Sequence, residues 1–169
     1  MPSSRPELSE LRVPGDPAGW ERAGFTVIDG AIPLGGVRIV PGGEPGWSFG
    51  TPDAPAVEHP NGAAAIDHVV LLTGDFDATV ERLRSEGLDY RRTREAGDIR
   101  QAFFVLGPCL LEVTGPVDGG ERLWGVTLVA PDLEPCGGRI KDAVQPGRKI
   151  TTIPREAGLG FPVAVMTPR

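Results

Sequence analysis

The sequence predicts an α+β protein built from repeated units of β-α-β-β-β order. One complete unit can be recognised between residues 65 and 116, and a similar order of short segments recurs on both sides of it. Gly 24 and Pro 18 among 169 residues divide the chain into short pieces, which leaves little room for long helices. Because 40% of the residues are hydrophobic, these short elements can still bury a core.

The central unit, residues 65–116, is the clearest. Residues 66–72 form a short apolar run rich in β-branched side chains, typical of a buried strand. Residues 75–86 predict a helix, because apolar residues recur at i, i+4 and i+7: Phe76, Val80 and Leu83. Three further strands follow, separated by turn residues: 90–94, 99–106 and 109–114.

The C-terminal unit, residues 117–169, repeats this order in a degenerate form. Its expected strands are 123–129, 148–153 and 162–167. A short helix or turn opens at Pro131, where the central unit has its helix. The basic residues between Lys141 and Lys149 are expected to form a solvated turn.

The N-terminal third, residues 1–50, is expected to be a degenerate β-rich module. A strand, a stunted helix and three short strands are predicted there: 8–13, 16–23, 25–28, 37–40 and 47–49. Residues 51–64 are predicted to be a linker, because their prolines exclude a helix or a central strand. An N-terminal third of this size is too small to bury a core alone, so it should pack on the rest of the chain.

Charge and composition exclude several classes of function. With 17 Lys+Arg against 23 Asp+Glu, the net charge is −6, and the pI is about 4.9. Such a surface does not suit nucleic acid or an anionic membrane. No apolar run approaches the ~20 residues that span a bilayer, and the N-terminus lacks a signal-peptide segment. We therefore expect a cytoplasmic protein.

Two strands of the central unit each carry one polar, metal-competent side chain among apolar neighbours. On the first strand, alternation places Ile66, Val70 and Leu72 on the same face as His68. On the last strand, Leu110 and Thr114 share the face of Glu112. An ionised glutamate in such a strand is costly unless a donor or a cation meets it. His68 and Glu112 are therefore expected to converge, either on each other or on a shared metal.

The central unit resembles the vicinal-oxygen-chelate superfamily, which includes glyoxalase and bleomycin-resistance-like proteins. The resemblance rests on four segments: residues 65–71, 74–77, 103–107 and 110–116. It implies that two such units pair into a curved, cup-like mixed sheet with the site inside the cup. It also implies that His68 and Glu112 are ligands of a divalent metal. Imidazole and carboxylate donors suit Zn, Mn, Fe or Ni, and in a metal-dependent enzyme Glu112 would be the candidate catalytic base.

The flanking units depart from the pattern of that superfamily. When the two units are aligned, Gly125 of the C-terminal unit takes the position of His68, and Val165 takes the position of Glu112. Neither residue can ligate a metal through its side chain. The N-terminal module offers only Glu10 and Ser48 at these positions. The usual three or four protein ligands are therefore not visible.

Two functions that use this site stay open, and a purely structural or assembly role for a decayed enzyme is the third alternative. The first is a metal-dependent lyase, isomerase or dioxygenase acting on a substrate with vicinal oxygens. The second is a metal-free protein that binds or sequesters a small organic or antibiotic-like molecule. In either case the partner is a small molecule, and a homodimer is also open. Four residues on strands of the same sheet are the candidate substrate contacts, with ordinary core packing as the alternative for each: Gln101, Phe103, Trp124 and Thr127.

Overall fold

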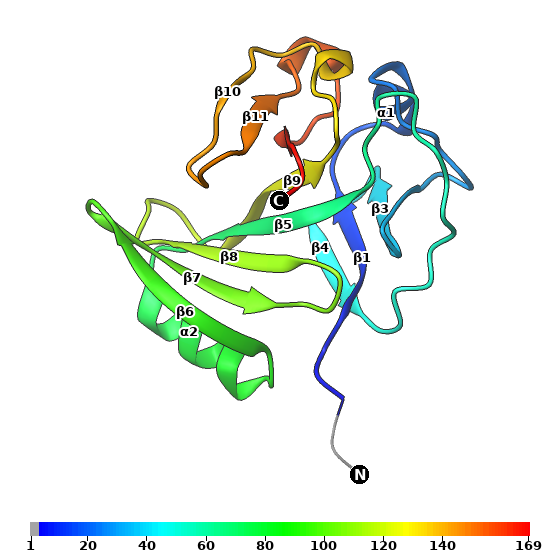
Figure 1. Ribbon diagram of the computed structural model, residues 1–169. Helices are drawn as coiled ribbons and strands as arrows, with labels where there is room; N and C mark the ends of the chain where they lie inside the picture. The colour runs from blue at the N-terminus through cyan, green and yellow to red at the C-terminus, as the bar shows by residue number, and fades with distance from the viewer. Residues whose placement is uncertain (1–3) are drawn as a thin grey trace.

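The computed structural model describes residues 4–169 and contains two β-sheets (Figure 1). The larger is an eight-stranded mixed sheet with the order β10-β11-β12-β9-β5-β8-β7-β6. The smaller has four strands in the order β2-β3-β1-β4 and comes entirely from the N-terminal third. The sequence-predicted α+β class with a curved, cup-like mixed sheet is confirmed.

The central unit forms one half of the large sheet. Its elements are β5 (Ala65–Leu72), α2 (Phe76–Ser85), β6 (Asp89–Ala96), β7 (Ile99–Val105) and β8 (Leu110–Gly115). β5 pairs in parallel with β8, and the antiparallel strands β7 and β6 follow outward. α2 lies along the outer, convex face of this half (Figure 1).

The buried side of α2 differs slightly from the predicted stripe. Asp75 caps the helix by accepting a hydrogen bond from the backbone N–H of Ala78. Phe76 and Leu83 are buried as predicted, but Thr79 is buried as well, whereas Val80 is only half-buried. The Thr79 hydroxyl can lie inside because it is hydrogen-bonded to the hydroxyl of Thr73 at 2.8 Å.

The C-terminal unit forms the other half with the same connectivity. Its elements are β9 (Arg122–Val129), η1 (Glu134–Cys136), β10 (Lys141–Asp142), β11 (Lys149–Thr152), η2 (Arg155–Ala157) and β12 (Val163–Met166). β9 pairs in parallel with β12, and β11 and β10 follow antiparallel. A single 3-10 turn, η1, replaces the helix of the central unit. The two units join through antiparallel pairing of their first strands, β5 and β9.

The expected solvated turn between Lys141 and Lys149 is found at residues 144–147, which are exposed, but both of its ends differ from the prediction. Lys141 and Asp142 form the edge strand β10, which pairs with β11. Arg148, at the end of the turn, is buried.

The N-terminal unit contains β1 (Leu8–Val13), α1 (Pro17–Arg22), β2 (Ile32–Leu34), β3 (Val37–Pro41) and β4 (Gly46–Phe49). The strand expected at residues 25–28 is wrong. Asp29 and Gly30 both have positive φ and turn the chain directly after Ile28, so β2 begins only at Ile32. The N–H of Thr26 bonds instead to His59 Nδ1, a residue of the 51–64 segment.

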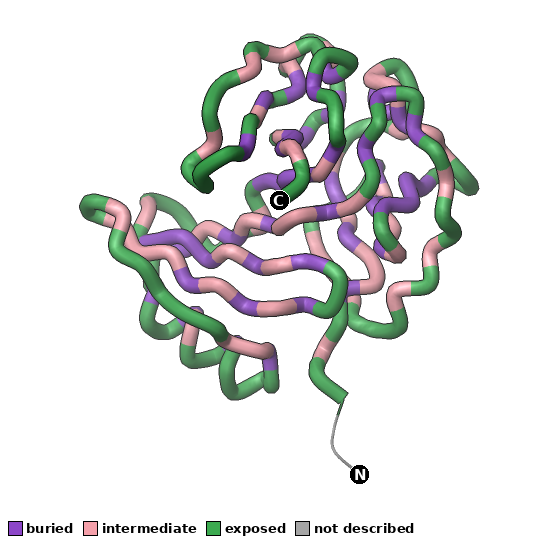
Figure 2. The backbone as a smooth tube through the Cα atoms, in the orientation of Figure 1, coloured by how far each residue is buried: buried purple, intermediate pink, exposed green. Residues whose placement is uncertain are grey.

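The core is continuous across all three units. Buried apolar side chains of the N-terminal strands, β5, β8, β9 and β12 belong to one cluster, and Figure 2 shows buried positions concentrated along the central strands. The inward side chains of β9 and β12 are fully or almost fully buried although their own unit supplies no helix: Val126, Leu128, Val163 and Val165. These side chains belong to the same core cluster as the buried side chains of the N-terminal unit.

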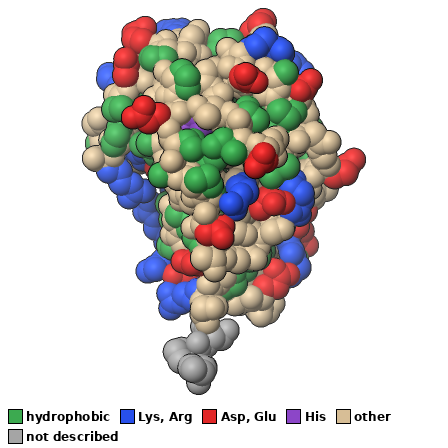
Figure 3. All heavy atoms as spheres, turned by 90° about the vertical axis from the view of Figure 1, so that its right-hand side faces the viewer, with side chains coloured by type: hydrophobic (Ala, Val, Ile, Leu, Met, Phe, Trp, Pro, Cys, Tyr) green, Lys and Arg blue, Asp and Glu red, His purple; other side chains and the backbone are tan. Residues whose placement is uncertain are grey.

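The outer face of the N-terminal unit mixes apolar side chains with scattered charges of both signs (Figure 3). Within residues 4–169, no helix is long and apolar enough to cross a membrane.

Candidate functional site

A bulge in β5 shapes the site. Ile66 pairs with Leu128 and His68 with Thr127, so Asp67 is an extra residue in β5 that has no counterpart in β9. The bulge shifts the alternation of faces: Ile66 is buried with the core, contrary to the prediction that it shares the face of His68. It also brings two consecutive side chains together, because Asp67 Oδ2 and His68 Nδ1 are 2.8 Å apart.

Asp67 joins His68 to a buried arginine of the C-terminal unit. Arg148 Nη2 donates to Asp67 Oδ1 at 3.0 Å, and Arg148 Nε donates to the carbonyl of Thr167 at 2.8 Å. Burial alone would raise the pKa of Asp67, but the hydrogen bonds from His68 and Arg148 outweigh it and lower this pKa to about 2. Asp67 is therefore an ionised acceptor that holds the Nδ1–H of His68 and leaves Nε2 for other partners.

Glu112, on β8, is held by a separate set of donors. Gln101 Nε2 on β7 donates to Glu112 Oε1 at 2.6 Å, and the Thr114 hydroxyl donates to the same oxygen at 2.9 Å. Gln101 is itself oriented by Arg94, whose Nε donates to Gln101 Oε1 at 2.6 Å. One carboxylate oxygen of Glu112 is thus fixed by two donors, while Oε2 takes no part in these bonds.

The remaining atoms of these two groups face each other. His68 Nε2 and Glu112 Oε2 are 3.5 Å apart, and the side chains are only 16% and 15% exposed. This separation exceeds the usual length of a direct hydrogen bond, which is about 2.7–3.2 Å for N–H···O. The convergence predicted from the strand faces is therefore found, and the two atoms are close enough for one ligand atom or ion to contact both.

The other predicted contacts lie on the same sheet at different distances from this pair. Phe103 on β7 is directly opposite Glu112, and Thr127 on β9 is directly opposite His68. Trp124 is an extra residue in β9, since Val70 pairs with Gly125 and Leu71 with Leu123, and its side chain is 49% exposed. The substrate-binding roles of all four predicted residues stay predictions.

Two exposed arginines on β6 border Phe103. The guanidinium carbons of Arg92 and Arg94 lie 5.2 Å and 5.7 Å from the centre of its ring. This edge of the concave face is therefore cationic, although the whole chain is acidic.

The C-terminal half brings no further metal-binding side chain to this pair. Within residues 4–169, no group of three or more His, Cys, Asp or Glu side chains is placed to hold an ion. The gap between His68 Nε2 and Glu112 Oε2 does suit two ligands of one metal at the usual ~2.0–2.2 Å. The residues present therefore provide half of a protein donor set.

A pocket of about 450 Å³ borders the same network at the end of the sheet. Asp67 and Arg148 line it together with Cys109, Leu110 and the chain end near Arg169. Burial, and to a lesser degree the charge of Asp67, raises the pKa of the Cys109 thiol to about 12. Cys109 is consequently a thiol at neutral pH and not a nucleophile.

Sequence reasoning missed four residues that hold the pair in place: Asp67, Arg94, Thr114 and Arg148. Asp67 did carry a signal, because successive side chains of a regular strand point to opposite faces, so two adjacent polar residues share one face only where the strand is bulged. Arg148 carried none, since its partner is 81 residues away in sequence.

The chain matches no family model and no curated protein at the sequence level. Solved structures do match its fold. The methylmalonyl-CoA epimerase of Mycobacterium tuberculosis superposes with a TM-score of 0.55 at 16% identity, covering 67% of this chain and 93% of the epimerase. A selenomethionine methylmalonyl-CoA epimerase gives 0.50 at 13% identity, covering 63% and 97%. These enzymes are vicinal-oxygen-chelate proteins. The chain therefore has the fold of the vicinal-oxygen-chelate superfamily, as its sequence resemblance implied.

Proposed function

We propose that this protein binds a small organic molecule on the concave face of the eight-stranded sheet, where His68 and Glu112 are the polar groups that meet it. The observation that carries the proposal is the 3.5 Å gap between His68 Nε2 and Glu112 Oε2. Hydrogen bonds orient both groups: Asp67 holds His68, and Gln101 and Thr114 hold Glu112. Convergent, preorganised polar groups of this kind are typical of small-molecule sites.

The chemistry of the pair defines what the ligand must offer. With its Nδ1–H donated to Asp67, a neutral His68 presents the lone pair of Nε2. Glu112 Oε2 is also an acceptor, so two acceptors face each other. A ligand amine that contacts both atoms could donate one N–H to each, whereas a hydroxyl or an acidic C–H has a single hydrogen and would donate to only one of them. Glu112 is the candidate base if the protein is an enzyme, because its Oε2 is the oxygen that Gln101 and Thr114 leave available.

A metal-dependent enzyme is the second candidate. It is favoured by the same gap, and by Asp67 behind His68, since a carboxylate commonly orients a metal-bound histidine. Against it stand Gly125 and Val165, which occupy the corresponding positions of the C-terminal unit and carry no donor. His68 and Glu112 would hold the ion, and the other ligands would have to be water or the bound molecule.

A protein-observed NMR titration tests the first candidate. The probes are a panel of small hydroxy and keto acids together with methylmalonyl-CoA, the compound named for the enzymes that share this fold. We expect shifts at the amides of His68, Phe103 and Glu112, and at least tenfold weaker binding to Glu112→Gln. The matched control is Glu81→Gln on exposed α2. Shifts confined to other surfaces, or equal binding by Glu112→Gln, contradict the proposal.

Metal analysis distinguishes the second candidate. Protein purified without an affinity tag or chelator should hold one equivalent of a divalent metal, and His68→Ala should lose it, if the site is a metal centre. Binding of an organic probe without bound metal supports the metal-free function.

A further inference from the structure

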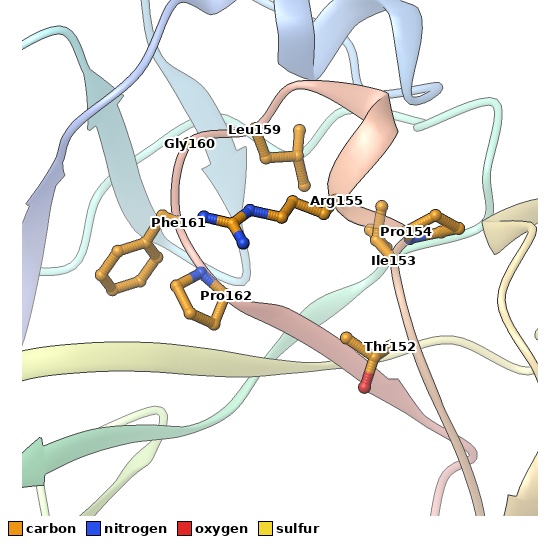
Figure 4. A pocket seen from close by; sticks show the side chains of 8 residues that line it. All are labelled: Thr152, Ile153, Pro154, Arg155, Leu159, Gly160, Phe161 and Pro162. Atoms are coloured by element: carbon orange, nitrogen blue, oxygen red, sulfur yellow. The ribbon is translucent and has the colours of Figure 1, made fainter.

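The C-terminal unit contains a second pocket, of about 460 Å³, in the segment that joins β11 to β12 (Figure 4). Ile153, Leu159 and Phe161 line it and are themselves buried, which fixes these walls in place. Two proline rings, Pro154 and Pro162, add further apolar surface. A cavity of this volume with mainly apolar walls is of the size that small organic ligands occupy.

One charged side chain lies in this apolar setting. Figure 4 shows the guanidinium of Arg155 extending across the pocket toward Phe161 and Pro162. Arg155 is exposed, and within residues 4–169 it forms neither an ion pair nor a side-chain hydrogen bond. Arg148, in contrast, is bound to Asp67 and to the carbonyl of Thr167. The donors of Arg155 are therefore free, and a planar guanidinium matches a carboxylate through two parallel hydrogen bonds.

The pocket lies at the end of the same cross-strand row as His68. Thr152, which lines the pocket, pairs with Ala164, Ala164 with Thr127, and Thr127 with His68. Three strand spacings of ~4.8 Å separate Thr152 from His68, which is about 14 Å along the sheet. A ligand of moderate length can therefore reach from one to the other.

The N-terminal unit holds the pocket segment in position. A Cβ at Gly19 of α1 would lie 2.2 Å from the carbonyl oxygen of Gly158, and one at Gly15 would lie 2.3 Å from that of Leu159. These backbone-to-backbone contacts exist only because both positions are glycine. The segment from Gly158 to Leu159 is thus packed against a fixed surface, and the pocket is preformed.

We propose that this pocket binds the carboxylate end of an organic acid, with Arg155 pairing with the carboxylate and Leu159, Phe161 and Pro162 contacting its apolar body. The ligand then extends over Thr152 toward His68 and Glu112. That extension rests on the function proposed above, whereas the capture of a carboxylate by Arg155 does not. The C-terminal unit, which lacks ligating side chains at positions 125 and 165, contributes an anion-binding end to the site instead.

Phenylacetate and its neutral analogue phenylacetamide test this assignment by protein-observed NMR of the full chain. We expect phenylacetate to shift the amides of residues 152–162 and phenylacetamide to bind at least tenfold more weakly. Arg155→Gln should weaken phenylacetate binding at least tenfold, the loss expected for a charge-assisted hydrogen bond. Arg155→Lys keeps the charge but not the paired geometry, and should lie between the two.

Arg84→Gln is the matched control, because it removes one positive charge from an exposed position on α2, and it should leave phenylacetate binding unchanged. Equal binding of acid and amide, or equal binding by Arg155→Gln, overturns the proposal. Because Arg155 is exposed, its variants should fold as wild type, and their amide spectra show this directly. If Arg155→Gln loses phenylacetate binding but no probe shifts the amides around Glu112, the carboxylate pocket is supported. Only the extension of its ligand to the concave face is then contradicted.

Discussion

The central and C-terminal units share one strand connectivity but differ in what they place on it. The central unit carries a helix on its convex face and the His68–Glu112 pair on its concave face. The C-terminal unit has a 3-10 turn in place of the helix, Gly125 and Val165 in place of polar groups, and a pocket with Arg155. The repeated topology therefore supplies equivalent positions, whereas the residue at each position determines its chemistry.

The two halves also obtain their second layer differently. α2 covers the convex face of the central half from within the unit, whereas the C-terminal half has only a 3-10 turn in that place and shares its core with the N-terminal unit. This explains why the chain can dispense with a helix after β9, and why its N-terminal third contributes apolar side chains to one common core.

The strongest test of the connection between the halves is Arg148→Met, which removes a buried partner of Asp67 across the two units. The buried Asp67 carboxylate then keeps only its hydrogen bond to His68, and because breaking a buried ion pair costs about 3–5 kcal/mol, the free energy of unfolding in urea should fall by up to that amount. Lys149→Met is the control at the next position, because Lys149 and its partner Asp142 are both exposed. Similar losses of unfolding free energy from both substitutions would mean that the ion pair of Arg148 with Asp67 does not stabilise the contact between the two units.

The support from the N-terminal unit is tested by Gly19→Ala. The added Cβ meets the backbone of Gly158, which cannot move aside like a side chain, so we expect a loss near the upper end of the overpacking range, about 3 kcal/mol. Gly43→Ala, which meets nothing within 4 Å, should leave the unfolding free energy nearly unchanged. A Gly19→Ala protein with an unaltered melting temperature would show that this contact does not stabilise the segment between β11 and β12.

Acid should lower the stability of the fold by protonating Asp67. Its folded-state pKa, about 2, lies below the ordinary value of 3.8, so ionised Asp67 stabilises the fold at neutral pH. That contribution, about 2 kcal/mol, is present above pH 4 and is lost as the pH falls toward 2. Urea unfolding of wild type and Asp67→Asn at several pH values measures it. The two proteins should differ at pH 7 and converge near pH 2; a constant difference contradicts this assignment.

The smallest effect is expected on the outer side of α2. Arg84→Ala removes an exposed side chain whose guanidinium carbon lies 4.9 Å from the centre of the Tyr90 ring, and should change the unfolding free energy by no more than about 0.5 kcal/mol. Leu83→Ala, at the next position but fully buried, should cost about 2–5 kcal/mol. Thermal or urea unfolding of the pair checks which face of the helix is buried. Equal effects would show that this face is wrongly assigned.

Local patterns were sufficient to predict the central unit, since strand alternation and helix spacing placed β5, α2 and β8 and brought His68 toward Glu112. They failed where structure depends on backbone turns or distant partners. The positive φ angles at Asp29 and Gly30 moved β2, and the bulge at Asp67 reversed the face of Ile66. Burial of Arg148 depends on an acidic partner that only the assembled sheet brings near.

A crystallographic fragment screen is the most direct test of whether the concave face is the ligand site, because it locates bound small molecules over the whole surface. We predict fragments on the concave face that contact both His68 Nε2 and Glu112 Oε2, and their loss in crystals of Glu112→Gln. Fragments that gather elsewhere while this face stays empty in the wild-type protein would contradict the assignment of the concave face as the ligand site.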